Sequence, residues 1–266
     1  MKNKALLVGI NKYPNPRNEL KGCVNDILDM GHFITETNKI YEKENVKLLT
    51  DKNAHKKEIV AHIKWLMEGA ESGDQLLFHY SGHGAQVPTH HSRIEKDGLD
   101  EIICPYDFDG SPGTTLSDKE FAQLFESIPK GVHFVWISDS CHAADLSRDP
   151  FIIGETNYRN FHGISTHLNE PVLNPIYTSG ELAEIIKPLK GALLSACASN
   201  ELSADALINN RYNGAFTHYL INNLAKYGDS QPMNKIIEFV NTDLNKNGYD
   251  QNPESEGLLE NKTFFM

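Results

Sequence analysis

One histidine and one cysteine follow two apolar runs of the sequence, in an arrangement that suits acyl-transfer chemistry. The run Leu-Leu-Phe-His-Tyr-Ser-Gly-His-Gly reaches His83, and the run Phe-Val-Trp-Ile-Ser-Asp-Ser-Cys reaches Cys141. A thiol becomes a strong nucleophile when a neighbouring imidazole takes its proton. Glycines flank the histidine, so the backbone can approach closely, and the amides of Gly84 and Cys141 are candidates to stabilise an oxyanion. These residues predict acyl transfer with Cys141 as nucleophile and His83 as general base.

Short apolar runs alternate with longer amphipathic segments, which predicts an α/β fold with a mostly parallel sheet covered by helices. The predicted strands are Lys4–Ile10, Val46–Leu49, Gln75–Tyr80, Val132–Ser138, Gly191–Ala196 and Lys262–Met266. The predicted helices are Asp26–Glu36, Ala54–Glu68, Asp118–Ile128, Phe216–Lys226 and Met233–Leu244. Sites in such sheets form beyond the carboxyl ends of the strands. We therefore expect His83 and Cys141 to emerge at the same edge.

The regular alternation stops after the cysteine and resumes about forty residues later. Residues 1–147 form a larger part that carries the histidine and the cysteine, and residues 191–266 form a smaller part that completes the same sheet. Between them, residues 148–190 read as an irregular insertion, because Asn, Pro, Gly, Ser and Thr are scattered among isolated apolar residues. The sequence therefore predicts one structural domain with an insertion.

Composition and charge limit the partners of the chain. Its 266 residues are 39% apolar, its net charge is −11, and it has no run of five basic residues. These features argue against nucleic acid and anionic membranes and favour basic peptides. The first apolar stretch, Ala5 to Ile10, is too short for a signal peptide core or a membrane span. Four widely spaced cysteines suggest free thiols. We expect a cytoplasmic monomer.

The residues alone leave other readings open. A cysteine after a buried strand can be an inert core thiol, and a histidine between glycines can be a turn residue. Cys104 and Cys197 lie beside apolar runs and read as core thiols. Zinc is disfavoured, because neither His90-His91 nor Cys141-His142 has further ligands at a suitable spacing.

The sequence blocks around the histidine and the cysteine resemble the two catalytic blocks of metacaspases. These blocks are Tyr80-Ser81-Gly82-His83-Gly84 and Asp139-Ser140-Cys141-His142. Further similar blocks occur in the same order, at residues 20–26, 97–107, 195–205 and 214–217. The Gln-Ala-Cys block of animal caspases is absent. The resemblance is to the type I-like members, and we expect a bacterial one.

This resemblance implies a caspase-like three-layer sandwich and a cysteine endopeptidase that cuts after arginine or lysine. The matching residues of the acidic specificity pocket are Asp26 and Asp139, with Cys23 and Ser81 nearby. A guanidinium withdrawn from water needs carboxylates within bidentate reach, which agrees with that role. Two plainer readings remain, with Asp26 as an exposed residue in the first turn of its helix and Asp139 as a backbone cap.

The chemistry requires no cofactor, but many metacaspases bind calcium through a cluster of aspartates. Asp100 and Asp118 match two of those positions, and Asp145 or Asp149 are stand-ins for others. Lys119 occupies a position where a ligand is expected, and an ammonium beside a dication is unfavourable. A calcium requirement is therefore not expected to be strong, and a solvated acidic face explains these residues equally well.

Two rival functions stay open. One is a catalytically silent caspase-like module that binds partners, and the other is a different cysteine hydrolase or transferase on a similar sheet. If the chain cuts itself, we expect the cut after Arg148, Arg159, Lys187 or Lys190, within the irregular insertion.

Overall fold

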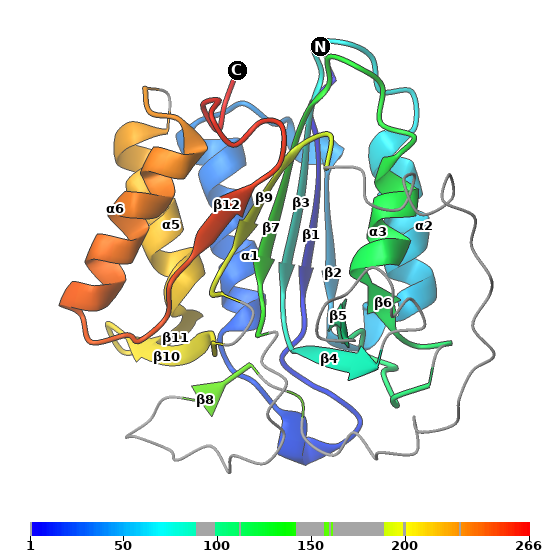
Figure 1. The fold of residues 1–266 in the computed structure, drawn as a ribbon, viewed down its shortest axis with the longest axis vertical. Helices are drawn as coiled ribbons and strands as arrows, with labels where there is room; N and C mark the ends of the chain where they lie inside the picture. Colours follow the sequence, from blue (N-terminus) through cyan, green and yellow to red (C-terminus); the bar gives the residue numbers. More distant parts are fainter. Residues whose placement is uncertain are drawn as a thin grey trace.

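A six-stranded sheet runs through the middle of the molecule (Figure 1). The computed structural model describes residues 2–88, 99–111, 113–141, 157–159, 161, 189–198, 201–228 and 230–266. The sheet has the order β12-β9-β7-β3-β1-β2, and all its strands are parallel except the antiparallel edge strand β12. Their bounds are β1 Lys4–Gly9, β2 Val46–Thr50, β3 Gln75–Ser81, β7 His133–Asp139, β9 Ala192–Ser195 and β12 Glu254–Glu256.

Helices cover both faces of this sheet, which gives three layers (Figure 1). One face carries α1 (Cys23–His32), α5 (Ala215–Tyr227) and α6 (Met233–Lys246), and the other carries α2 (Lys56–Met67) and α3 (Asp118–Phe125). Alternate residues of β1, β3, β7 and β9 enter opposite cores, because successive side chains of a strand point to opposite faces. The central strands β3 and β7 are buried along their whole length, which explains their continuous apolar runs.

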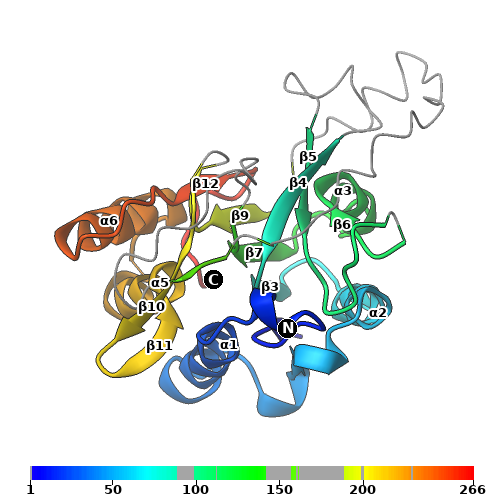
Figure 2. The ribbon, with the colours of Figure 1, turned by 90° about the horizontal axis from the view of Figure 1, so that it is seen from below.

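Two small antiparallel sheets lie beyond the carboxyl end of the main sheet (Figures 1 and 2). One consists of β4 (Gly84–Pro88), β5 (Leu99–Ile103) and β6 (Leu116–Ser117). The other consists of β8 (Asn157–Tyr158), β10 (Ala204–Ile208) and β11 (Arg211–Gly214). Between β10 and β11, Asn209 and Asn210 both have positive φ angles, as the tightest hairpin turns require. The sequence analysis did not identify these short strands.

The closing strand predicted at Lys262–Met266 is wrong. Glu254–Glu256 closes the sheet instead, pairing antiparallel with β9. Phe264 and Phe265 pack into the core on the α1, α5 and α6 face, so their apolar pattern reflects burial without strand pairing.

The two regular parts of the chain, residues 1–147 and 191–266, both contribute strands to the main sheet. Most of the insertion at 148–190 lies outside the described residues, which include only 157–159, 161, 189 and 190 of that segment. Within the described ranges, no helix is long and apolar enough to span a bilayer.

Candidate active site

The register between β3 and β7 brings His83 and Cys141 to the same level. Ser81 pairs with Asp139 at the ends of these parallel strands, and the histidine and the cysteine each follow two residues later. Both residues are buried. The two backbones approach so closely here that a Cβ atom on Gly84 would lie 2.0 Å from the carbonyl oxygen of Cys141. Glycine at this position is therefore a steric requirement of the site.

Neighbouring residues fix the orientation of the His83 ring. Its Nε2 lies 2.9 Å from the carbonyl oxygen of Asn18. Because a carbonyl oxygen only accepts, Nε2 carries a proton, and in the neutral ring Nδ1 then holds the lone pair. The hydroxyl of Tyr13 accepts a hydrogen bond from the backbone N–H of His83 at 3.0 Å and donates to the carbonyl of Cys104 at 3.2 Å. The imidazole is thus held in the tautomer that a general base needs.

All four cysteines are buried, but their surroundings differ. The Cys141 sulfur accepts a hydrogen bond from the backbone N–H of Ser203 at 2.8 Å. Contact with the Cys141 side chain, together with burial, raises the pKa of Cys197. Burial raises the pKa of Cys23 and Cys104 as well. These three residues are therefore neutral thiols at ordinary pH.

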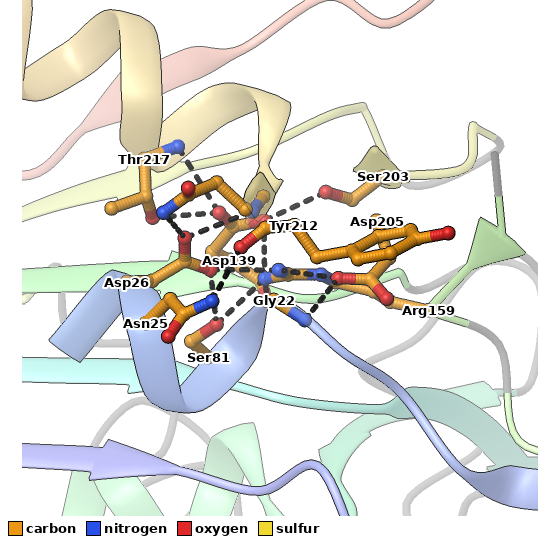
Figure 3. A network of polar contacts seen from close by, with 12 residues as sticks. Gly22, Asn25, Asp26, Ser81, Asp139, Arg159, Ser203, Asp205, Tyr212 and Thr217 are labelled. Carbon is orange, nitrogen blue, oxygen red and sulfur yellow. Dashed lines mark hydrogen bonds and ion pairs between the residues drawn. The ribbon is translucent and has the colours of Figure 1, made fainter. Parts of the chain in front are cut away.

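Three fully buried carboxylates surround the guanidinium of Arg159, which is itself fully buried (Figure 3). We call Asp26, Asp139 and Asp205 the acidic cluster. Arg159 Nη1 lies 2.9 Å from Asp139 Oδ1, and its Nη2 lies 2.7 Å from Asp26 Oδ2 and 3.5 Å from Asp205 Oδ1. Nη1 also donates to Ser81 Oγ at 2.7 Å. Burial alone would lower the pKa of Arg159, but these carboxylates raise it well above its usual value.

Fixed hydrogen-bond donors hold the acidic cluster in place. Gly214 N–H donates to Asp26 at 2.8 Å, and Thr217 donates to Asp139 through both its backbone N–H and its hydroxyl, at 3.1 and 2.6 Å. Both donors belong to the first turn of α5 or directly precede it, where the helix dipole favours negative charge. Burial raises the pKa of Asp205, and the charge of Arg159 opposes that rise. These buried carboxylates therefore need a positive charge among them.

The backbone around Arg159 is held like a strand added to a sheet. Asn157 and Tyr158 form β8, which pairs antiparallel with the start of β10. Arg159 N–H donates to the carbonyl of Ser203 at 3.1 Å, and Gly84 N–H donates to the carbonyl of Arg159 at 3.2 Å. Ser203 therefore contacts both the Cys141 sulfur and the backbone of Arg159.

The structure brings together the residues that the sequence analysis assigned to the specificity pocket. Asp26 is fully buried, so its reading as an exposed residue is wrong. Asp139 contacts the guanidinium and also accepts a hydrogen bond from the backbone N–H of Thr217 in α5, which agrees with its reading as a backbone cap. Its role in a specificity pocket stays a prediction. Cys23 and Ser81 are buried beside the cluster, where Ser81 Oγ donates to Asp26 at 2.8 Å.

Sequence reasoning missed Asp205 as a member of this cluster. The signal was present, because Asp205 is a carboxylate inside the otherwise apolar strand β10, Ala-Asp-Ala-Leu-Ile. Such a buried acid is kept only when it has partners. Its partners are the backbone N–H groups of Lys21 and Gly22, both at 2.8 Å, and Arg159.

A second group of charges lies on β5 and α3, where the sequence suggested calcium. Lys119 Nζ lies 2.5 Å from Asp100 Oδ1 and 3.4 Å from Asp118 Oδ2. Lys119 and Asp100 are buried, whereas the Asp118 side chain is 42% exposed. We call these three residues the lysine cluster. An ammonium between the two expected ligands does not fit a bound dication, because the like charges would repel.

The other metal candidates from the sequence lie outside the described residues, namely His90, His91, His142, Asp145 and Asp149. Among the residues that are described, no group of three or more His, Cys, Asp or Glu side chains is arranged to hold a metal ion.

The comparison with known protein families decides the class of this site. A sequence model of the metacaspase peptidase C14 domain matches residues 3–148, which is more than half of the chain. The chain belongs to the metacaspase family. It is 28% identical to Metacaspase-1 of Coccidioides immitis over 95% of its length, and 32% identical to Metacaspase-1A of Aspergillus oryzae over 75%. It spans 61% of the first of these relatives and 48% of the second.

The metacaspase fold also has a counterpart among solved structures. A crystal structure of a protein from Geobacter sulfurreducens matches all of this chain and 99% of its own, with a TM-score of 0.72 and 24% identity. The predicted caspase-like α/β sandwich is therefore confirmed. Membership of the family confirms that this is a cysteine peptidase domain, whereas a bacterial origin stays a prediction.

Proposed function

We propose that this metacaspase domain is an endopeptidase that cuts peptide bonds after arginine or lysine, with Cys141 as nucleophile and His83 as general base. The observation that carries the proposal is the binding of Arg159. Its guanidinium lies in the acidic cluster while its carbonyl oxygen accepts from Gly84 N–H. A single residue thus makes the side-chain and backbone contacts that an arginine substrate would need on the amino-terminal side of the scissile bond.

In the proposed reaction, His83 takes the thiol proton of Cys141, and the thiolate attacks the carbonyl carbon of the substrate arginine. The negative charge that develops on the carbonyl oxygen is stabilised by Gly84 N–H, with Cys141 N–H as the proposed second donor. The carbon–nitrogen bond then breaks, and the protonated imidazole gives its proton to the leaving amine. Water next attacks the thioester while His83 removes a water proton, which releases the acid and restores the thiol.

The acidic cluster supports selectivity for a basic side chain. Three buried carboxylates face one site, and desolvated charges of like sign need a counter-ion. An arginine satisfies them with paired hydrogen bonds, which is a geometry that lysine only partly reproduces. Neutral or acidic side chains would leave the carboxylates unpaired. We therefore expect arginine to be preferred over lysine, and both over all other residues.

We further propose that the reaction does not depend on calcium. The ammonium of Lys119 already supplies a positive charge to Asp100 and Asp118. We also propose that the reaction needs no cofactor, because a thiol and an imidazole suffice for its chemistry.

The wider setting of the activity is proposed from composition alone. The net charge of −11 supports peptides or proteins with exposed basic residues as substrates. We propose a monomer that acts in the cytoplasm, without nucleic acid or membrane partners.

A catalytically silent binding module is the second candidate, and one observation favours it. Arg159 has no exposed surface and occupies the acidic cluster, so a second arginine enters only after this one leaves. A panel of fluorogenic peptides that differ only in the residue before the scissile bond separates the two candidates. The peptidase predicts hydrolysis of the arginine and lysine peptides, with equal rates in millimolar calcium and in excess chelator. Hydrolysis of no peptide under either condition would favour the silent module.

A further inference from the structure

The segment that carries Arg159 also has an anchor beyond the place where the proposed reaction would put a scissile bond. Phe161, two residues further along, is 7% exposed. Its ring makes edge contacts with three aromatic rings, those of Tyr13, His83 and Phe108, at centroid distances of 5.5, 5.5 and 4.8 Å. Such contacts add to the free energy gained by burying the ring.

We propose that Tyr13, His83 and Phe108 form an aromatic subsite that selects a phenylalanine, or a similar aromatic residue, two positions after the scissile bond of a substrate. This inference rests on the proposed cleavage after arginine and adds a second specificity element to it. The preferred substrate class is then a peptide with arginine, any residue and an aromatic residue in succession.

The position of this aromatic subsite agrees with the direction of the reaction. The leaving amine belongs to the residue that follows the arginine, and His83 must reach that nitrogen to protonate it. The chain beyond the scissile bond therefore has to pass the imidazole. Phe161 lies against that imidazole, which is the side on which the proposed mechanism requires the leaving part of the substrate.

The aromatic subsite is also held rigidly. The Tyr13 hydroxyl bonds to the backbone of His83 and Cys104, and its ring lies 4.9 Å from the imidazole. Phe108 N–H donates to the carbonyl of Pro105 at 3.0 Å, which closes a turn directly after β5. A rigid aromatic surface binds a partner ring with little loss of conformational entropy.

Two internally quenched peptides test the proposal on the wild-type protein. One contains Asn-Tyr-Arg-Asn-Phe, which copies residues 157–161, and the other has alanine in place of the phenylalanine. We expect kcat/KM to be about tenfold higher for the phenylalanine peptide. Competition from the chain's own segment lowers both values by the same factor, so the ratio is unaffected.

A pair of variants checks which residues produce the ratio. Phe108→Ala removes one wall of the aromatic subsite and should bring the ratio close to one. Phe239→Ala, on the distant helix α6, removes a half-buried aromatic ring elsewhere and should leave the ratio near tenfold. Equal rates for the two peptides, with the arginine bond cut in both, would overturn the aromatic subsite and leave the proposed function standing. No hydrolysis of either peptide would overturn the proposed function, and the aromatic subsite with it.

Discussion

The acidic cluster and the lysine cluster both bind a positive side chain of the chain itself, but they obtain it from different places. Arg159 reaches Asp26 across 133 residues of sequence, whereas Lys119 directly follows Asp118 on the first turn of α3. A guanidinium from a distant segment can be exchanged for that of a substrate. An ammonium on the same helical turn stays within reach of both carboxylates for as long as the helix is intact. This difference supports the two proposals that the acidic cluster recognises a substrate arginine and that the lysine cluster replaces a calcium ion.

The local structure around Lys119 supports its permanence. Ser117 and Glu120 form a reciprocal capping box, in which Glu120 N–H donates to Ser117 Oγ at 3.2 Å and Ser117 N–H donates to Glu120 Oε2 at 3.0 Å. This cap fixes the first turn of α3 and with it the position of the ammonium. Around Arg159, by contrast, the described backbone contacts are those of the two-residue strand β8 and one hydrogen bond at each of the Arg159 N–H and carbonyl groups. The side chains of Arg159 and Phe161 supply the other contacts of this segment.

The largest effect on activity is expected from removing the proposed nucleophile or the proposed general base. Cys141→Ala and His83→Ala should each lower kcat/KM for arginine peptides by about 10⁴-fold or more, because neither partner works without the other. Steady-state hydrolysis with a fluorogenic arginine peptide measures this, and circular dichroism checks that both variants are folded. Retention of more than a tenth of the wild-type rate by either variant would show that the roles are wrongly assigned.

The acidic cluster should show graded losses. Asp26→Ala and Asp139→Ala each remove a carboxylate within 2.9 Å of the guanidinium, so kcat/KM for arginine peptides should fall by about 10³-fold. Asp205 Oδ1 lies further away, at 3.5 Å from Arg159 Nη2, so Asp205→Asn should lower kcat/KM by about tenfold. Asp29→Asn is the matched control, since Asp29 lies one turn along α1 and pairs with Arg211. Equal cleavage after alanine and arginine by the wild type would contradict this account of the cluster.

The lysine cluster should affect stability more than selectivity. Lys119→Met removes the ammonium and leaves Asp100 buried without its counter-ion, so the free energy of unfolding should fall by about 3 kcal/mol. Urea unfolding with and without millimolar calcium measures this. The variant should gain more stability from calcium than the wild type does, because the vacated carboxylates can then bind it.

Lys43→Met, in an exposed ion pair with Glu36, is the control and should change nothing measurable. A hundredfold rise in wild-type activity on adding calcium would show that Lys119 does not replace the ion.

The smallest effect concerns a buried histidine behind the acidic cluster. The hydroxyl of Thr217 donates to Asp139, so His79 Nε2 must donate to that hydroxyl, at 3.3 Å. Burial lowers the pKa of His79 to about 4. Because the unfolded chain binds this proton more readily than the folded chain, His79 costs stability as pH falls from about 6.5 towards 4.

At pH 5 this cost should be about 2 kcal/mol relative to pH 7.5. His79→Gln has no proton to take up and should show a flatter dependence of unfolding free energy on pH. Parallel curves for the two proteins would contradict the assigned pKa.

The sequence predicted the parts of the fold that have a strong local pattern. The continuous apolar runs of β3 and β7 are confirmed as central strands, and their parallel register places His83 and Cys141 at the same edge of the sheet, as expected. The buried aspartates Asp26 and Asp139 were found through the resemblance to metacaspases. Residues that follow the ends of strongly apolar strands could thus be predicted from the sequence.

The contacts that we propose to define specificity could not be predicted from the sequence. The strand β8 has two residues, too few for a period-2 pattern, and it pairs with residues 46 to 48 positions further along the chain. The contacts of Asp205 with Arg159 and of Phe161 with His83 form only because the Arg159 segment lies between β10 and the His83 loop. Phe264 and Phe265 led to the wrong prediction of a closing strand, because core packing and strand pairing favour the same apolar residues.

The central claim is that the Arg159 segment lies in the site as a substrate does. Incubation of the purified wild type beside Cys141→Ala, followed by amino-terminal sequencing of the fragments, tests it directly. The account predicts a new amino terminus at Asn160 in the wild type and none in Cys141→Ala, with Arg159→Ala uncut at that bond. A wild type that cleaves arginine peptides but is itself cut only after other residues, or not at all, would contradict it.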